Sequence, residues 1–163
     1  MPKLAPYRPR TLTPIARVPG LDYDVLDDLL GYSLRRAQVA MFIAFHEATR
    51  GMDITPPRFT ALVLIGANPG MSQTALGNVL GIARSGAMLM TDWFAGRGLV
   101  ERRTLPNDGR AWGLHLTRKG EQVVERMKRR VLELDLRKAH SLTKTERQEL
   151  LRLLGKLTNG KSA

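Results

Sequence analysis

The residues of this 163-residue chain that could support catalysis or bind a metal do not form a recognisable set. Its histidines, His46, His115 and His140, lie far apart and lack the spacing of a metal-binding motif such as HExxH. The chain has no cysteine, and no glycine-rich loop follows a strand-like run as nucleotide-binding motifs require. The sequence therefore predicts no enzyme, no catalytic residue, no metal site and no cofactor.

Arginine side chains, by contrast, are placed where they could bind a polyanion. Arg84 begins a helical pattern, and Arg102, Arg103 and Arg110 flank the turn-forming sequence 106–109, Pro-Asn-Asp-Gly. A guanidinium group binds phosphates and the edge of guanine, so this placement favours double-stranded DNA as the partner. The whole chain agrees, since 26 Lys and Arg against 15 Asp and Glu give a net charge of +11. Charge alone leaves an anionic membrane surface as an open alternative.

Two short helices are expected to position these arginines. Ser72 is a typical N-cap before an apolar stripe of Leu76, Val79 and Leu80, and Gly81 ends that pattern. The second helix is predicted over 83–95, and its inward face consists of Ala87, Met90, Thr91 and Phe94. This register points Arg84, Ser85 and Met88 outward.

Two strand-like runs, 99–105 and 111–117, follow these helices and predict an antiparallel ribbon. Two helices and a basic-tipped ribbon make a winged helix-turn-helix. Three stretches of this segment are distinctive: Leu-Gly-Ile-Ala-Arg-Ser at 80–85, Arg-Gly-Leu-Val-Glu-Arg at 97–102, and Asp108-Gly-Arg110 leading to Leu116-Thr117. In these stretches the segment resembles the DNA-binding head of the multiple-antibiotic-resistance regulator (MarR) family.

This resemblance, together with residue chemistry, implies a set of DNA contacts. Ser72 and Gln73 begin a helix whose N-terminus attracts a phosphate, and Arg84 and Ser85 would reach base edges or the flanking backbone. Arg102 and Arg103 would neutralise phosphates. The family's Asp-x-Arg pair implies that Asp108 orients Arg110 in the minor groove. In the alternative interpretation, Asp108 only forms the turn and Arg110 is a solvated charge.

The second helix departs from the family at its exposed positions. Where relatives usually carry hydroxylated or basic side chains, this chain has Ala83, Gly86, Met88 and Leu89. Met88 could contact a thymine methyl group, but this surface offers few hydrogen bonds to bases. Specificity is then expected from the wing and from DNA shape, or affinity is broad. An alternative for Leu89 is that it packs within the head.

Apolar helical patterns flank the head, which spans about residues 55–117. We expect dimerisation helices over about 21–50 and 121–158, preceded by a basic, proline-rich arm over 1–20, so that 21–163 form a single domain. Acids near the start of the first helix, the Thr55-Pro56 pair and the Thr143–Glu146 capping box indicate helix starts. Neither flank can bury its stripe alone, and the resemblance implies that these helices intertwine in an obligate homodimer.

The resemblance also implies a small aromatic ligand, or a larger acyl-coenzyme A (acyl-CoA) thioester, bound between the frame and the head. Residues 31–37 resemble the hydroxycinnamoyl-CoA-responsive members. Candidate ligand contacts combine aromatic faces and cations: Tyr32, Arg36, His46, Arg58 and Phe59. Alternatively, His46 is a core or interface histidine, and Arg35 and Arg36 form an intersubunit ion pair.

The chain is therefore predicted to be mainly α-helical with a small β-wing, a winged helix-turn-helix head on a helical dimerisation frame. The predicted function is a ligand-relieved repressor that binds a pseudo-palindromic operator. A weakly specific or architectural DNA-binding protein, and an interaction module that has lost DNA binding, are the alternatives. No apolar run could span a bilayer and three early prolines interrupt any signal peptide, so a cytoplasmic protein is expected.

Overall fold

The computed structural model describes residues 13–105 and 108–159, and for residues 105, 108–111 and 159 it describes the backbone alone. In these residues the elements follow the order η1 (Asp24–Asp27, a 3-10 helix), α1 (Leu30–Ala48), α2 (Pro56–Ala67), α3 (Gln73–Leu80), α4 (Arg84–Gly96), β1 (Val100–Leu105), β2 (Asp108–Leu116), α5 (Arg118–Lys138) and α6 (Lys144–Asn159). This architecture confirms the mainly helical fold with a two-stranded antiparallel wing.

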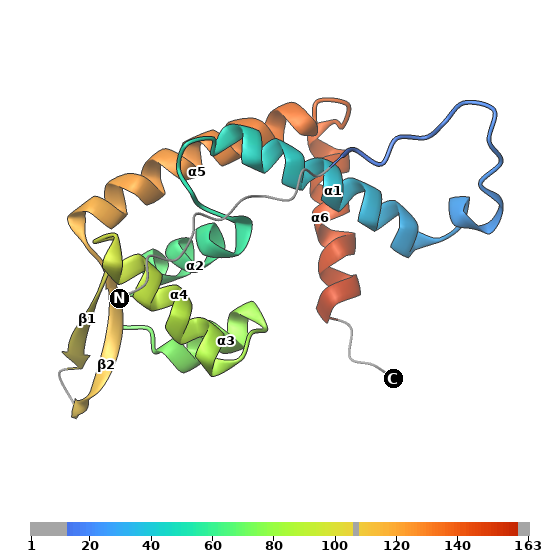
Figure 1. Cartoon of the computed structure of the whole chain (residues 1–163). Coiled ribbons are helices and arrows are strands. Elements are labelled where there is room, and N and C mark those ends of the chain that lie inside the picture. The colour runs from blue at the N-terminus through green and yellow to red at the C-terminus, as the bar shows by residue number, and fades with distance from the viewer. Residues whose placement is uncertain (1–12, 106–107, 160–163) are drawn as a thin grey trace.

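The long helix α5 connects the two ends of the molecule (Figure 1). It leaves the wing formed by β1 and β2, packs against α2 and α1, and then leads into α6, which turns away from it. Helices α3 and α4 lie below α2, beside the wing. The arrangement separates a compact head, made of α2, α3, α4 and the wing, from an extended frame of α1, α5 and α6.

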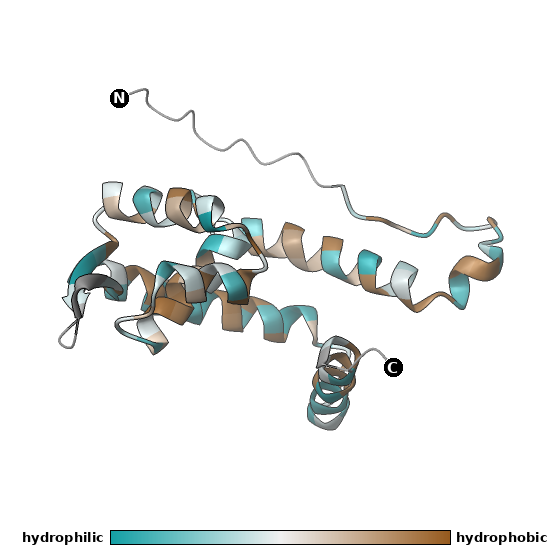
Figure 2. Ribbon diagram, turned by 90° about the horizontal axis from the view of Figure 1, so that it is seen from below, coloured by the Kyte–Doolittle hydropathy of each residue, from teal (hydrophilic) through white to brown (hydrophobic). Residues whose placement is uncertain are grey.

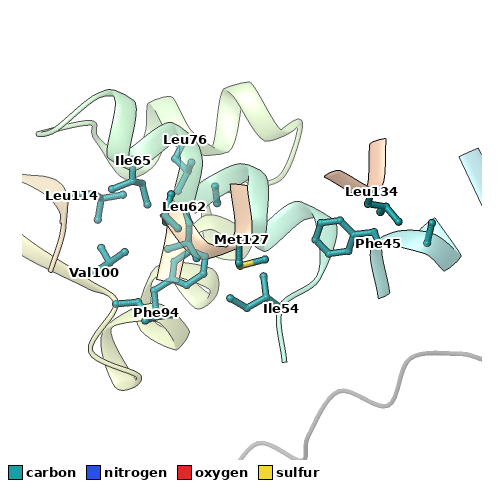
Figure 3. Close-up of a cluster of buried hydrophobic side chains, with 14 residues drawn as sticks. Phe45, Ile54, Leu62, Ile65, Leu76, Phe94, Val100, Leu114, Met127 and Leu134 are labelled. Carbon is teal, nitrogen blue, oxygen red and sulfur yellow. The ribbon is translucent and has the colours of Figure 1, made fainter. Parts of the chain in front are cut away.

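A single apolar core joins the head to α5 (Figure 3). Phe94 of α4, Leu62 and Ile65 of α2, Leu76 of α3 and Met127 of α5 are fully buried in it. The expected inward stripe of α4 is confirmed, because Ala87, Thr91 and Phe94 are buried and Met90 packs against the core. Val79 was wrongly placed in the inward stripe of α3 and is exposed, and Leu89 is 64% exposed, so it does not pack within the head.

The first dimerisation helix, expected over about 21–50, is shorter, and it does not begin at its acids. The Asp22 carboxylate accepts a hydrogen bond from the Asp24 backbone N–H at 2.9 Å, and Asp24 has a φ of 46°. Such local side-chain bonding competes with helix formation, so a single 3-10 turn forms there and α1 starts at Leu30. At the other end Thr49 is the C-cap, and Gly51, with a φ of 81°, lies in the following turn.

Helix α5 begins directly after the wing, at Arg118 instead of the predicted 121. Thr117 is its N-cap: its hydroxyl accepts from the Gly120 N–H at 3.0 Å and donates to the Gly98 carbonyl at 2.6 Å. A side chain on Gly120 would overlap the Leu99 carbonyl oxygen, so only glycine lets α5 approach β1 this closely. The wing and the frame are therefore joined without a flexible linker.

Apolar side chains remain exposed on the frame helices, where teal and brown alternate along the ribbon (Figure 2). They lie at the start of α1, on the second half of α5 and along α6: Leu30, Leu132, Leu136, Leu150, Leu151, Leu153 and Leu157. The Thr143–Glu146 capping box that begins α6 is formed as predicted. Across the described ranges, no helix combines the length and apolar character needed to span a bilayer.

Candidate nucleic-acid interface

The turn between α3 and α4 follows from three local interactions. The Ser72 hydroxyl accepts from the Ala75 N–H at 3.1 Å and so caps α3. Gly81 ends α3 in the left-handed region, with a φ of 63°. The Ile82 N–H then donates to the Gly77 carbonyl at 3.0 Å, which brings the start of α4 close to the end of α3. As predicted, Arg84, Ser85 and Met88 are exposed on α4.

A shallow hollow of about 240 Å³ lies where the starts of α3 and α4 meet the wing. Its lining is Ser72, Gln73, Thr74, Arg84, Arg102, Trp112 and Leu114. Four residues predicted to contact DNA, Ser72, Gln73, Arg84 and Arg102, are thus brought together from three elements. Trp112, 57% exposed, was not predicted as a site residue, although it continues the period-two series of Leu114 and Leu116.

A buried hydroxyl connects three elements beneath this hollow. Thr91 of α4 is only 1% exposed, and its hydroxyl donates to the Met88 carbonyl at 2.9 Å. The same oxygen accepts from the Gln73 amide of α3 and from the Arg102 guanidinium of β1, the latter at 3.3 Å. Arg102 also pairs with the Asp92 carboxylate at 2.5 Å. Asp92 could not be predicted as a site residue from the sequence, because its partner lies on a different element.

Of the other predicted wing contacts, the structure describes the side chain of Arg103 but only the backbone of Asp108 and Arg110. Arg103 pairs with the carboxylate of Glu101 on the same strand. The backbones of Asp108 and Arg110 belong to β2, with Leu105 opposite Asp108, whereas their side chains lie outside the described residues. Their predicted pairing therefore stays a prediction.

The candidate ligand contacts fall into three separate groups. The Arg36 guanidinium lies 5.8 Å from the Tyr32 ring centre and donates to the Ile15 carbonyl at 3.3 Å. His46 and Phe59 both pack on Phe45, with ring centres 6.2 and 5.7 Å from it.

Arg58 belongs to a different cluster, next to α4. Its guanidinium lies 3.8 Å from the Trp93 ring centre, and that of Arg97 lies 3.7 Å from the same ring. Arg97 is also paired with Asp53 at 2.8 Å. The cluster ties the loop after α1 to the end of α4.

Two helices with an antiparallel wing, and an arginine at the start of the second helix, define a winged-helix DNA-binding protein. Comparison with known proteins agrees. The MarR family model matches residues 54–112. Over 129 residues, 78% of each chain, the protein is 35% identical to the "putative transcriptional regulatory protein for hcr operon" of Thauera aromatica. The chain belongs to the MarR family and is a DNA-binding transcriptional regulator, not an enzyme.

Solved structures similar to this chain include two of the transcriptional repressor CouR. The form bound to a 23-mer DNA duplex is 36% identical, with a TM-score of 0.79, and the match covers 85% of this chain and 99% of that one. The form bound to p-coumaroyl-CoA is 34% identical, with a TM-score of 0.75 and coverage of 86% and 99%. PcaV of Streptomyces coelicolor, in complex with its natural ligand, is 25% identical with a TM-score of 0.71, over 83% and 95%.

Proposed function

We propose that this protein is a homodimeric repressor that binds a pseudo-palindromic operator and is released by an aromatic acyl-CoA thioester. The observation that carries the proposal is the exposed face at the start of α4, beside the capped N-terminus of α3 and the wing. A helix of this length fits the major groove, and the wing then follows the backbone toward the minor groove.

Individual contacts are assigned by chemistry and exposure. The N-terminus of α3 at Ser72 would bind a phosphate. Arg84 and Ser85 would approach base edges, and Met88 would meet a thymine methyl group. In the wing, Arg103 would contact a phosphate and Arg110, aligned by Asp108, would enter the minor groove. Gln73 and Arg102 already donate to Thr91, so they are the weaker candidates for direct phosphate contacts.

The apolar surface of the frame supports the homodimer. Leucines left exposed along α6 and the second half of α5 are expected to be covered by the same helices of a second subunit. Two-fold symmetry would present two heads to half-sites about one helical turn, ~34–36 Å, apart.

The effector is proposed from the relatives and from aromatic and cationic residues of α1 and α2. CouR, at 34% identity, has been solved with p-coumaroyl-CoA. Tyr32 with Arg36 on α1, and His46 with Phe59 around Phe45, would provide aromatic surface and hydrogen-bonding groups for such a ligand. Arg58, stacked on Trp93, would transmit ligand binding to α4 or supply a cation at the edge of the ligand site.

The proposal is tested with a fluorescent duplex taken from upstream of the coding region of this protein. Anisotropy should report saturable binding that p-coumaroyl-CoA weakens, whereas p-coumaric acid and free coenzyme A serve as controls. If a panel of aromatic acids and their thioesters leaves the affinity for this duplex unchanged, the proposed effector is wrong. If the protein shows no saturable binding, the proposed operator is wrong.

A weakly specific DNA-binding protein is the second candidate. Its support is the exposed apolar surface of α4, where Met88 and Leu89 offer bases few hydrogen bonds. This candidate predicts a steep salt dependence with similar affinity for the upstream duplex and for random duplex.

A further inference from the structure

An acid lies on the helix face that would meet DNA. Asp92 follows Arg84 and Met88 at intervals of four residues, so the three side chains share one face of α4. Its side chain is 50% exposed. A carboxylate at this position repels phosphates unless a cation neutralises it.

The cation is Arg102, and it comes from a different element. Its guanidinium, 38% exposed, pairs with Asp92 at 2.5 Å and also donates to the buried Thr91 hydroxyl at 3.3 Å. Thr91 uses its own proton on the Met88 carbonyl, so its oxygen accepts the bonds from Arg102 and Gln73. The wing strand β1, the centre of α4 and the first turn of α3 are thereby fixed to one another.

Within the described part of the wing, the neighbouring Arg103 has no such connecting role. Its carboxylate partner, Glu101, lies two residues earlier on the same strand, so that pair joins no two elements. Sequence alone makes Arg102 and Arg103 look equivalent, whereas their partners separate them.

We propose that Arg102 and Asp92 form a positioning pair that fixes the wing relative to α4, and that Arg102 is not a phosphate contact. This inference rests on the proposed function. A half-exposed ion pair contributes little to the free energy of unfolding. Its loss should therefore change mainly the position of the wing relative to α4. Because the pair has no net charge, it also contributes little to counterion release. Its effect should therefore appear in the preference for the operator over random DNA.

The double variant Arg102→Ala/Asp92→Ala tests this, because it keeps the net charge of the protein. Affinity is measured for a duplex that the wild-type protein selects from a random pool, and for an unselected duplex, over a range of salt concentrations. We expect the preference for the selected duplex to fall about tenfold, the size of one pairwise coupling. The salt slope and the affinity for the unselected duplex should stay unchanged. Each single variant should lower the preference by about as much as the double.

A matched control is Glu125→Ala/Lys128→Ala, which removes an exposed ion pair of α5 with the same change of charge. It should leave the preference unchanged. Asp92→Asn, which keeps an acceptor for Arg102, should retain more of the preference than Asp92→Ala. A circular dichroism melt close to that of wild type shows that the double variant is folded.

Two results would overturn the positioning pair. One is a salt slope that falls by about one in the double variant at unchanged preference, since this marks Arg102 as a phosphate contact. The other is an additive effect of the single variants. If wild-type protein binds no duplex, the proposed function fails, and the pair is still judged in the free protein by NMR. Exchange of the Arg102 guanidinium protons should be slow, and fast exchange that Asp92→Ala does not alter would contradict the pairing.

Discussion

The exposed arginines of the head differ in the carboxylates around them, and this difference separates an arginine that is ready to bind a base from those that must first exchange a carboxylate for a phosphate. Arg97, Arg102 and Arg103 each pair with an acid. Among the side chains that the structure describes, Arg84 has no ion-pair partner, so with respect to these carboxylates its charge is available at the start of α4. Arginine at a guanine edge is the commonest specific contact in the major groove.

Arg84→Ala is therefore expected to weaken binding to the selected duplex by roughly 10- to 100-fold, equivalent to ~1–3 kcal/mol. Binding to unselected duplex should fall less, because a base contact carries sequence information and a phosphate contact does not. Anisotropy titrations of both duplexes measure the two effects. Equal losses on both duplexes would make Arg84 a backbone contact.

Unlike Arg84→Ala, Arg110→Ala should weaken binding to selected and unselected duplexes alike, because Arg110 is proposed to enter the minor groove chiefly as a charge. Affinity should drop for every duplex tested, and the slope of log affinity against log salt should fall by about one. A salt titration that matches wild type would exclude the wing tip from binding.

At the scale of elements, the junction between the wing and α5 depends on one glycine. Gly120→Ala places a methyl group on the Leu99 carbonyl and should cost roughly 1–3 kcal/mol of unfolding free energy, because the backbone must shift. Gly96→Ala is the matched control, since a side chain there has no neighbour within 4 Å among the described residues. Thermal unfolding should separate the two variants, and equal midpoints would contradict the close approach.

The start of α6 has a pH-dependent cap. Hydrogen bonds from the Thr143 backbone N–H, and then from its hydroxyl, lower the pKa of Glu146 from its ordinary value of 4.5. A carboxylate whose pKa is lower in the folded than in the unfolded protein stabilises the fold at pH values above its unfolded-state pKa. This stabilisation is lost as the pH falls through the folded-state pKa. The difference in melting temperature between wild type and Glu146→Ala should therefore be largest near neutral pH and shrink below about 4.5. Thr143→Ala should remove only part of that pH dependence, because the backbone N–H of residue 143 remains and is the larger cause of the lowered pKa. A difference that grows in acid would refute the cap.

Helix ends were predictable where one residue type decides them. Ser72, Gly81 and the Thr143–Glu146 pair act through bonds to neighbouring backbone, so sequence spacing reveals them. The start of α1 was mispredicted because Asp22 bonds the Asp24 backbone, an alternative that periodicity does not display. The outward face of α4 followed from its period of 3.6, which placed Arg84, Ser85 and Met88 correctly on the surface.

Contacts between elements could not be predicted in the same way. Arg102 lies ten residues after Asp92, on a strand whose orientation toward α4 is set by packing of the core. The same holds for Arg58 on Trp93, 35 residues apart in sequence. Sequence identified the cations of the head, and the fold decides which of them are already paired.

The frame of the whole molecule is expected to need a second subunit. A monomer leaves Leu150, Leu151, Leu153 and Leu157 of α6 in water, and a stable protein rarely exposes so continuous an apolar surface. Two heads held by one frame would also explain how α4, with few hydrogen-bonding side chains, could bind DNA usefully, since two half-sites act together.

Sedimentation equilibrium of the complex with the selected duplex measures how many chains bind together. We expect two chains of 18.2 kDa on each duplex. Leu151→Asp, which places a charge on the 59% exposed position of α6, should lower this to single chains with much weaker binding. One wild-type chain per duplex at full affinity, or no complex at low salt, would show that the protein does not bind DNA as a dimer.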